Sequence, residues 1–301
     1  MPAHSSPQGF QRVVEVPLAR WDEPMTAEDT ADAISAVESG AVLFFPRLAF
    51  ALEPNEQRFL ATRWHDGKAK NVSFDVSNGR VAGTGAQGED LQALTAMMSR
   101  FARGAASLCK TLFAAYRPPP VVMRTSYRAM PADVRESSWR KDDRLLHIDA
   151  FPSRPNHGAR ILRVFSNVNP EGQPRVWRIG ESFADMAQRF FPTLPPFHPL
   201  AARALSALHV TKATRSAYDH YMLLLHDAMK ADPDYQRSVP QVEMPFPPGS
   251  TWVCFSDQVS HAVLRGQYMF EQTLEVPVAA MQHPERSPLR VLEKIAARPL
   301  A

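Results

Sequence analysis

The chain has 301 residues, 45% of them hydrophobic and 22% charged, which suits a soluble globular protein with a large core. Its net charge of +3 gives no support for nucleic-acid binding, and its two cysteines, Cys109 and Cys254, lie too far apart in apolar surroundings to suggest a disulfide framework, which fits a reducing compartment. The first ten residues are polar and no run of 18 apolar residues occurs, so we expect neither a signal peptide nor a membrane-spanning helix.

The first 120 residues are expected to be mainly helical. Thr26 can cap a helix that ends at Gly40, and the apolar residues 42–46 predict a buried strand. Residues 53–63 are predicted to be helical, and the polar, glycine-rich residues 71–88 to form a mobile surface loop or lid. The longest predicted helix spans 91–116, with an apolar stripe formed by Leu91, Leu94, Met98, Phe101, Ala105, Leu108 and Leu112.

Residues 121–280 are predicted to be rich in strands. A helical insert is expected at about 181–231, with one helix at 181–191 and a second long helix within 200–231. A basic tail follows at 281–301. Helices first and strands later predict an α+β fold in one domain. The predicted strands are 121–128, 144–150, 159–168, 176–179, 252–255 and 267–276.

A histidine and an aspartate stand two positions apart in the second of these strands. On a strand, His147 and Asp149 would point to the same face. His261, 112 positions after Asp149, lies in a strand-turn-strand segment. Two histidines and one carboxylate can form the facial triad that holds non-haem Fe(II) and leaves coordination positions open. A single His-x-Asp pair also arises by chance, and both histidines could be structural in a non-catalytic cupin-like binding module.

The pattern resembles the Fe(II)/2-oxoglutarate dioxygenases, and more narrowly the Kdo 3-hydroxylases. Longer strings carry the narrower resemblance, namely His-Ile-Asp-Ala-Phe-Pro-Ser-Arg-Pro at 147–155, Gly-Ala-Arg-Ile-Leu-Arg-Val-Phe at 158–165 and Pro-Arg-Val-Trp at 174–177. The resemblance implies a double-stranded β-helix (jelly-roll, cupin-like) core with Fe(II) held by His147, Asp149 and His261. It also implies 2-oxoglutarate and O₂ as co-substrates and hydroxylation at C3 of a Kdo sugar on Kdo-lipid A, in the cytoplasm.

The distal carboxylate of 2-oxoglutarate needs a buried cation. Many members of the superfamily place an arginine about ten residues after the last histidine, where this chain has Glu271. The anchor must therefore come from elsewhere. Arg160 and Arg163 lie on opposite faces of one predicted strand, so at most one can point into a barrel, and Arg160 is held slightly ahead. The other candidates are Arg128 and Arg265.

An acidic glycolipid substrate would require cations at the mouth of the barrel. Arginine suits carboxylates and phosphates because its donors form a planar fork. The candidate substrate-binding residues are Arg140, Lys141, Arg154 and Arg175, with Arg144 and Arg178 nearby. Alternatives are a solvated basic face, a 2-oxoglutarate hydroxylase of peptides or amino acids, and nucleic-acid demethylation, against which the near-neutral charge argues. The amphipathic residues 285–301 could either dock on the inner membrane or pack on the barrel.

Overall fold

The structure is a computed structural model that describes residues 12–133 and 138–301. The polar first ten residues lie outside this part of the chain. An eight-stranded sheet dominates the structure, in the order β1-β2-β9-β6-β11-β5-β3-β4, and all of its strand pairs are antiparallel except β1 with β2. Its strands are β1 (Val13–Glu15), β2 (Val42–Phe45), β3 (Val72–Asp75), β4 (Arg80–Ala82), β5 (Val121–Arg128), β6 (Arg160–Asn167), β9 (Thr251–Phe255) and β11 (Met269–Val276).

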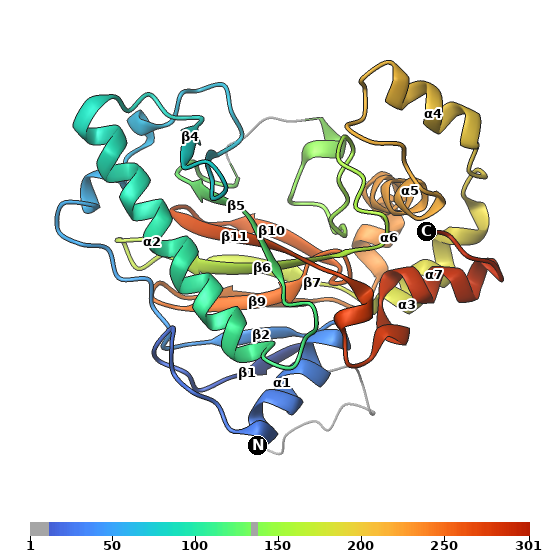
Figure 1. Ribbon diagram of the computed structural model, residues 1–301, viewed down its shortest axis with the longest axis horizontal. Helices are drawn as coiled ribbons and strands as arrows, with labels where there is room; N and C mark the ends of the chain where they lie inside the picture. The colour runs from blue at the N-terminus through green and yellow to red at the C-terminus, as the bar shows by residue number, and fades with distance from the viewer. Residues whose placement is uncertain (1–11, 134–137) are drawn as a thin grey trace.

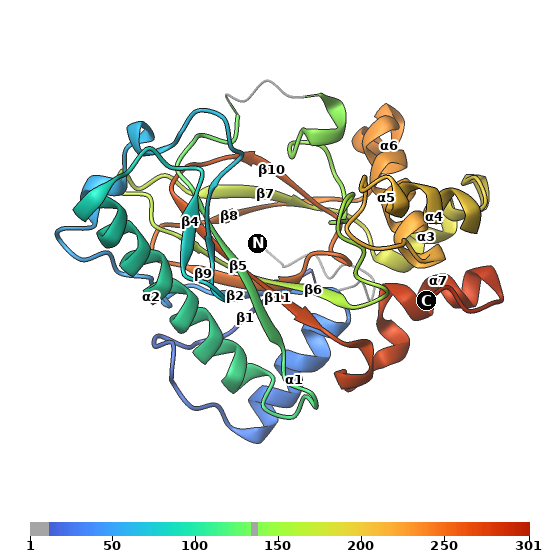
Figure 2. The same cartoon turned by 45° about the horizontal axis from the view of Figure 1, so that its top comes forward.

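A second, antiparallel sheet of three strands lies opposite the large one (Figure 2). Its order is β10-β7-β8, with β7 (Arg175–Ile179), β8 (Val242–Phe246) and β10 (His261–Arg265). Aromatic side chains fill the space between the sheets. Phe165 of β6 lies 5.0 Å from Trp177 of β7, and Trp252 of β9 stacks on Phe246 of β8 with ring centroids 4.2 Å apart. Packing of this kind fixes the separation of the two sheets.

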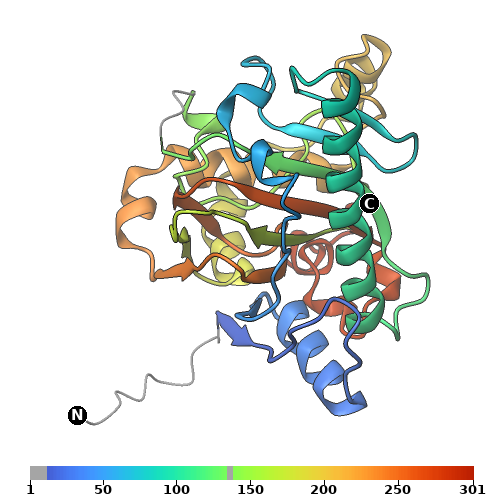
Figure 3. The same ribbon diagram turned by 90° about the vertical axis from the view of Figure 1, so that its left-hand side faces the viewer.

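Two helices cover the outer face of the large sheet. They are α1 (Ala27–Glu38), which Thr26 caps as expected, and α2 (Gly88–Leu112), which runs across the strands (Figure 3). All of the predicted α2 stripe is buried except Leu91, which is partly buried. The side chains of β6 alternate between two faces of the sheet. Leu162 and Val164 pack under these helices in a hydrophobic core, whereas Arg163 and Phe165 point into the space between the two sheets.

The remaining helices gather at one end of the sheets (Figure 1). In the sequence, four of them lie between β7 and β8, and the last follows β11. Their bounds are α3 (Phe183–Phe190), α4 (Pro199–Ala207), α5 (Ala217–Ala231), α6 (Pro233–Ser238) and α7 (Pro288–Ala296). Except for α4, they pack with Leu146 and Ile148, which flank His147, in one hydrophobic cluster and thereby support the chain at this point. Within α7, Leu289 and Leu292 are buried, so the C-terminal segment packs on the protein.

The N-terminal 120 residues contain more strand than the sequence analysis predicted, because β1 to β4 all join the large sheet. Residues 71–88 form the β3–β4 hairpin and not only a loop. Residues 53–63 contain only the short 3₁₀ turns Gln57–Phe59 and the first two residues of Thr62–Trp64. The long helix expected within 200–231 is α5, which Ser216 and Asp219 cap, and the shorter α4 precedes it as a separate helix.

Candidate active site

His147 and His261 face each other across a two-residue β-bridge. The main-chain nitrogen of His147 donates to the carbonyl of His261 over 2.9 Å, and the reverse bond measures 2.8 Å. The strand predicted at 144–150 is limited to this bridge. Its neighbours are bonded elsewhere, since Leu146 N donates to Oε1 of Gln236 and Asp149 N to the carbonyl of Ser256. Loop backbone, fixed by side-chain and main-chain bonds, therefore positions the His-x-Asp pair.

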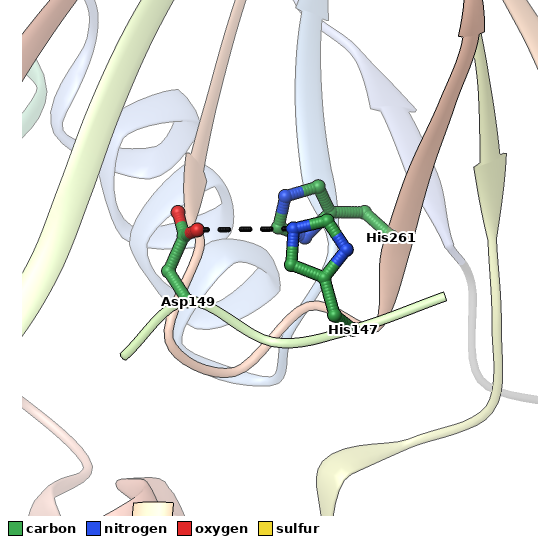
Figure 4. A group of neighbouring side chains, drawn as sticks. All are labelled: His147, Asp149 and His261. Carbon is green, nitrogen blue, oxygen red and sulfur yellow. Dashed lines mark ion pairs between the residues drawn. The ribbon is translucent and has the colours of Figure 1, made fainter. Parts of the chain in front are cut away.

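The three side chains converge on one point (Figure 4). One ligand atom from each of His147, Asp149 and His261 lies within 4.8 Å of the others, and His147 Nε2 is 4.0 Å from Asp149 Oδ1. Each Nδ1 donates to a main-chain carbonyl two residues earlier, that of Leu145 at 2.7 Å and that of Val259 at 2.8 Å. This bond fixes the tautomer, so each Nε2 presents a lone pair to the centre.

The charges around the triad keep it in the form that binds a metal. Burial lowers the pKa of both histidines, so their imidazoles are neutral at pH 7. Burial alone would raise the pKa of Asp149, but Arg163, with Nε 3.1 Å from Oδ2, and the two histidines lower it below its usual value. The donor set is therefore two imidazoles and a carboxylate, which suits Fe(II).

Glu271, at the position where an anchoring arginine was considered, holds two arginines in place. Its Oε2 accepts from Nη2 of Arg128 over 2.6 Å, and its Oε1 accepts from Nη1 of Arg163. Burial alone would raise the pKa of Glu271, but the two cations outweigh this effect and lower the pKa below its usual value. The carboxylate is therefore ionised. Arg163 thereby bridges Glu271 and Asp149, and its guanidinium orients the carboxylate that faces the metal position.

The triad opens into a pocket of about 210 Å³ between the two sheets. Arg175 in its wall is only 3% exposed and forms no ion pair with the described residues; Nη1 donates to the carbonyl of Gly266 over 2.7 Å and Nε has no partner there. Burial, with repulsion from Arg128, lowers the pKa of Arg175 to about 9. A buried guanidinium without a carboxylate is unfavourable, so the pocket is suited to an anionic ligand. The lining side chains are Lys70, Asn71, Arg128, Asp143, His147, Asp149, Arg163, Phe165, Arg175, Trp177, His261, Val263, Met269 and Glu271.

Comparison with known proteins identifies the family. The model of the 3-deoxy-D-manno-oct-2-ulosonic acid (Kdo) hydroxylase family matches residues 20–299. The chain belongs to this family. The expected family, and with it the enzyme class of 2-oxoglutarate-dependent dioxygenases, is confirmed.

Solved structures of the Kdo hydroxylase KdoO, a non-haem Fe(II) alphaketoglutarate-dependent dioxygenase, are similar to this chain over its whole length. The complex with alphaketoglutarate (2-oxoglutarate) and Fe(III) is 44% identical, covers 97% of this chain and 98% of its own, and has a TM-score of 0.93. The cobalt(II) complex is 45% identical, covers 96% and 97%, and has a TM-score of 0.94. A further complex contains succinate and Fe(III). None of the curated proteins compared with the chain matches it.

Two of the predicted anchor residues lie outside the pocket of this Kdo hydroxylase family member. Arg160 is fully buried on the other face of β6, where Nε donates to Asp257 over 2.8 Å and Nη2 donates to Gln258 over 2.6 Å. Arg265, the last residue of β10, is more than half exposed and lies 3.8 Å from Glu243. The preference for Arg160 is therefore corrected. Strand alternation places Arg163 between the sheets instead, beside Arg128 of β5.

The candidate substrate-binding residues are spread over three places. Arg175 lies in the metal pocket, as described. Lys141 lines a shallow depression of about 50 Å³ next to it, whereas Arg140 is exposed, pairs with Asp227 and stacks on Trp139. Of the nearby arginines, Arg144 pairs with Asp142, and Arg178 donates to the carbonyl of Arg144.

Arg154 borders a second pocket, of about 250 Å³. The same two strands line both pockets. On β6, Ile161 lies two residues from Arg163, and on β11, Thr273 lies two residues from Glu271, so each pair shares one face of its strand. Lys212 and Arg124 add further cations, and Glu275 is its single carboxylate. The lining residues are Met123, Arg124, Phe151, Ser153, Arg154, Asn156, Arg160, Ile161, Lys212, Thr273, Leu274 and Glu275.

The sequence analysis did not single out three residues of the metal pocket. Trp177 stacks on His261 with ring centroids 4.9 Å apart, and its Nε1 forms no hydrogen bond with the described residues. It stands in the Pro-Arg-Val-Trp string that carried the resemblance, so a signal was present. Lys70 and Asp143 form a 2.7 Å ion pair at the rim, but nothing in the polar segment around Lys70 pointed to it.

Proposed function

We propose that this protein is an Fe(II)/2-oxoglutarate-dependent hydroxylase that adds a hydroxyl group at C3 of a Kdo sugar on Kdo-lipid A. The observation that carries the proposal is the buried set of His147, Asp149 and His261 at the base of a pocket rich in cations. We also propose that the two facing sheets form a double-stranded β-helix, and that the described chain acts as one catalytic domain, since a shared aromatic core joins the sheets.

The three side chains fit Fe(II), for which they supply two neutral nitrogens and one carboxylate oxygen. When bound, Fe(II) with 2-oxoglutarate and O₂ supplies the chemistry that converts a C–H bond to C–OH while 2-oxoglutarate becomes succinate and CO₂. The protein's contribution is to hold the ligand geometry. Main-chain carbonyls orient both imidazoles, and Arg163 orients Asp149. Trp177 shields one face of His261 from solvent.

The charge of the pocket suits the dianion 2-oxoglutarate. Its lining has four cationic side chains and three carboxylates, so its formal net charge is +1, and Fe(II) would raise this value to +3. Arg128 and Arg163 are already paired with Glu271, whereas Arg175 has no carboxylate partner in the described part of the chain. Arg175 is therefore the proposed anchor for the distal carboxylate, with Arg128 next to it.

The second pocket is the proposed site for the acidic sugar. Arg154 and Lys212 form no ion pair with the described residues, and Arg124 reaches only the exposed edge of Asp75 at 3.9 Å. Besides Arg160, which is paired with Asp257, three cations face the single Glu275, and this excess favours a carboxylate or a phosphate over a neutral peptide segment. Because strands β6 and β11 connect this pocket to the triad, a bound sugar could present a C–H bond to the metal position.

We further propose that the enzyme works at the cytoplasmic face of the inner membrane. Among the residues that the structure describes, no helix is long and apolar enough to cross a membrane.

The test compares metal content and substrate oxidation in the wild type and in His147→Ala. We expect the wild type to bind one Fe(II) and to turn over 2-oxoglutarate faster with Kdo-lipid A than with any member of a peptide panel. His147→Ala should lose both the metal and the turnover. Stimulation by a peptide but not by Kdo-lipid A would overturn the substrate, and unchanged metal content in His147→Ala would overturn the metal site. Arg178→Ala, on the opposite face of β7 from Arg175, is the matched control.

A further inference from the structure

Helix α4 turns its largest apolar side chains outward. Leu200 is 78% exposed and Leu208 is 73% exposed, and Val210 in the following turn is 55% exposed. Leu200, Ala204 and Leu208 repeat at a spacing of four, so they share one face of the helix. The residue of α4 that is buried is the small Ala202. An amphipathic helix of a globular protein usually places its large apolar residues against the core, and Leu205 is partly buried in this way, so the exposure of Leu200 and Leu208 departs from the usual arrangement.

The chain on either side of this apolar face is basic, although Arg189 of α3 lies 3.6 Å from Glu181. No Asp or Glu occurs between Asp185 and Asp219, whereas four cations do, and the net charge of this stretch is strongly positive. Of these cations, Arg203 lies on α4 itself, where it is exposed and forms no ion pair with described residues. Exposed leucines flanked by basic residues are the composition of helices that lie in the interface of an anionic bilayer. The four cations are Arg189, Arg203, Lys212 and Arg215.

The apolar face adjoins the second pocket. The main chain of Lys212 donates to the carbonyl of Ser153 over 2.9 Å, and Arg215 donates to the carbonyl of Pro152. These bonds tie the segment after α4 to the loop that contains Arg154 and lines the pocket. Figure 1 shows α4 at the outer edge of the helical end, away from the large sheet. A bilayer in contact with α4 would therefore lie beside the proposed site for the acidic sugar.

We infer that residues 199–212 dock on an anionic phospholipid bilayer, with Leu200, Leu208 and Val210 in the boundary between head groups and acyl chains. The inference rests on the proposed function only in supposing that the substrate is bound to the membrane. The docking itself follows from the exposure of the apolar side chains and from the basic residues near them. It moves the membrane contact away from the C-terminal segment considered earlier, because the leucines of α7 are buried against the protein.

The test is co-sedimentation of the full-length protein with phosphatidylglycerol/phosphatidylcholine vesicles. We expect the wild type to bind and its binding to weaken with salt. The double variant Leu200→Asp/Leu208→Asp should partition at least about tenfold more weakly, since each buried leucine contributes about tenfold or more. The matched control is Val121→Asp/Val242→Asp, which changes two exposed apolar residues far from α4, 54% and 44% exposed, and should bind as the wild type does.

Three results would overturn the inference. The first is that the wild type does not bind vesicles, and the second is that the leucine variant binds them as well as the wild type does. The third is that the wild type binds no vesicles but forms a dimer in sedimentation velocity, and that the leucine variant does not. This third result would assign the apolar face to contact with a second copy of the chain. Thermal unfolding confirms that each variant is folded. Failure of the proposed function appears separately, as absence of Kdo-lipid A oxidation by a wild type that still binds vesicles.

Discussion

Arg175 is the residue whose replacement should weaken ligand binding and strengthen the fold at the same time. In the ligand-free protein, burial and the neighbouring Arg128 lower its pKa to about 9, well below the ordinary value of an arginine. At ~1.4 kcal/mol for each pKa unit, the charged guanidinium costs the fold roughly 5 kcal/mol at neutral pH. Arg175→Met removes the charge at similar length but loses the hydrogen bond to Gly266. We expect a net gain of about 2 kcal/mol in the free energy of unfolding.

The same substitution should weaken 2-oxoglutarate binding. Loss of one partner of a buried charge pair costs about 2–5 kcal/mol, which corresponds to a Kd roughly 30-fold higher or more. The affinity is measured by calorimetric titration of the Co(II)-loaded protein, and the stability by denaturant unfolding with the metal removed. The control is Arg178→Met, on the same strand but outside the pocket, which should change neither quantity by more than about 1 kcal/mol.

The stability gain has a defined pH dependence. The folded-state pKa is lowered, so the penalty is fully present below about pH 9 and decreases as the pH rises further towards the higher pKa of the unfolded state. The advantage of Arg175→Met should therefore shrink above pH 9. A variant that is less stable than the wild type at neutral pH, or one that keeps its 2-oxoglutarate affinity within threefold, would refute the reasoning.

Three further predictions concern the rest of the chain. Asp149→Ala should abolish Fe(II) binding, as measured by metal analysis after dialysis, because it removes one of three ligands and leaves Arg163 next to the metal position. Asp257→Ala should destabilise the protein by about 3–5 kcal/mol in denaturant unfolding, since it leaves Arg160 buried without its carboxylate, while the 2-oxoglutarate affinity of the folded fraction stays unchanged. Cys109 and Cys254 should react with a thiol reagent only after unfolding, because burial raises the pKa of both thiols; rapid reaction of the native protein would contradict their placement.

Long periodic segments were predictable from the sequence. The stripe of α2 defines one buried helix face, and β5 occurs with the bounds expected, Val121–Arg128. Strand β2 was predicted, at 42–46, whereas β1, β3 and β4 were missed because they have only three or four residues each and are too short to show alternation. The long helix expected within 200–231 occurs as α5 (Ala217–Ala231), whereas the shorter α4 before it was not predicted separately.

The site could be predicted in part. The spacing of His147 and Asp149 and the strand-turn-strand context of His261 brought together the three residues that the structure places within 4.8 Å of one another. Parity placed Arg160 and Arg163 on opposite faces of β6, but it could not say which face is inside, because both faces of this strand are buried. Arg175 is distinguished by the lack of an ion-pair partner among the described residues, a property of the tertiary packing that no local pattern shows.

The most direct test of the central claim is mass spectrometry of Kdo-lipid A after incubation with the Fe(II)-loaded protein, 2-oxoglutarate and ¹⁸O₂. The account predicts one ¹⁸O atom in the Kdo sugar, at C3, for each succinate formed, and no product without 2-oxoglutarate. Unmodified Kdo-lipid A, in the presence of a protein that binds Fe(II) and 2-oxoglutarate, would contradict it.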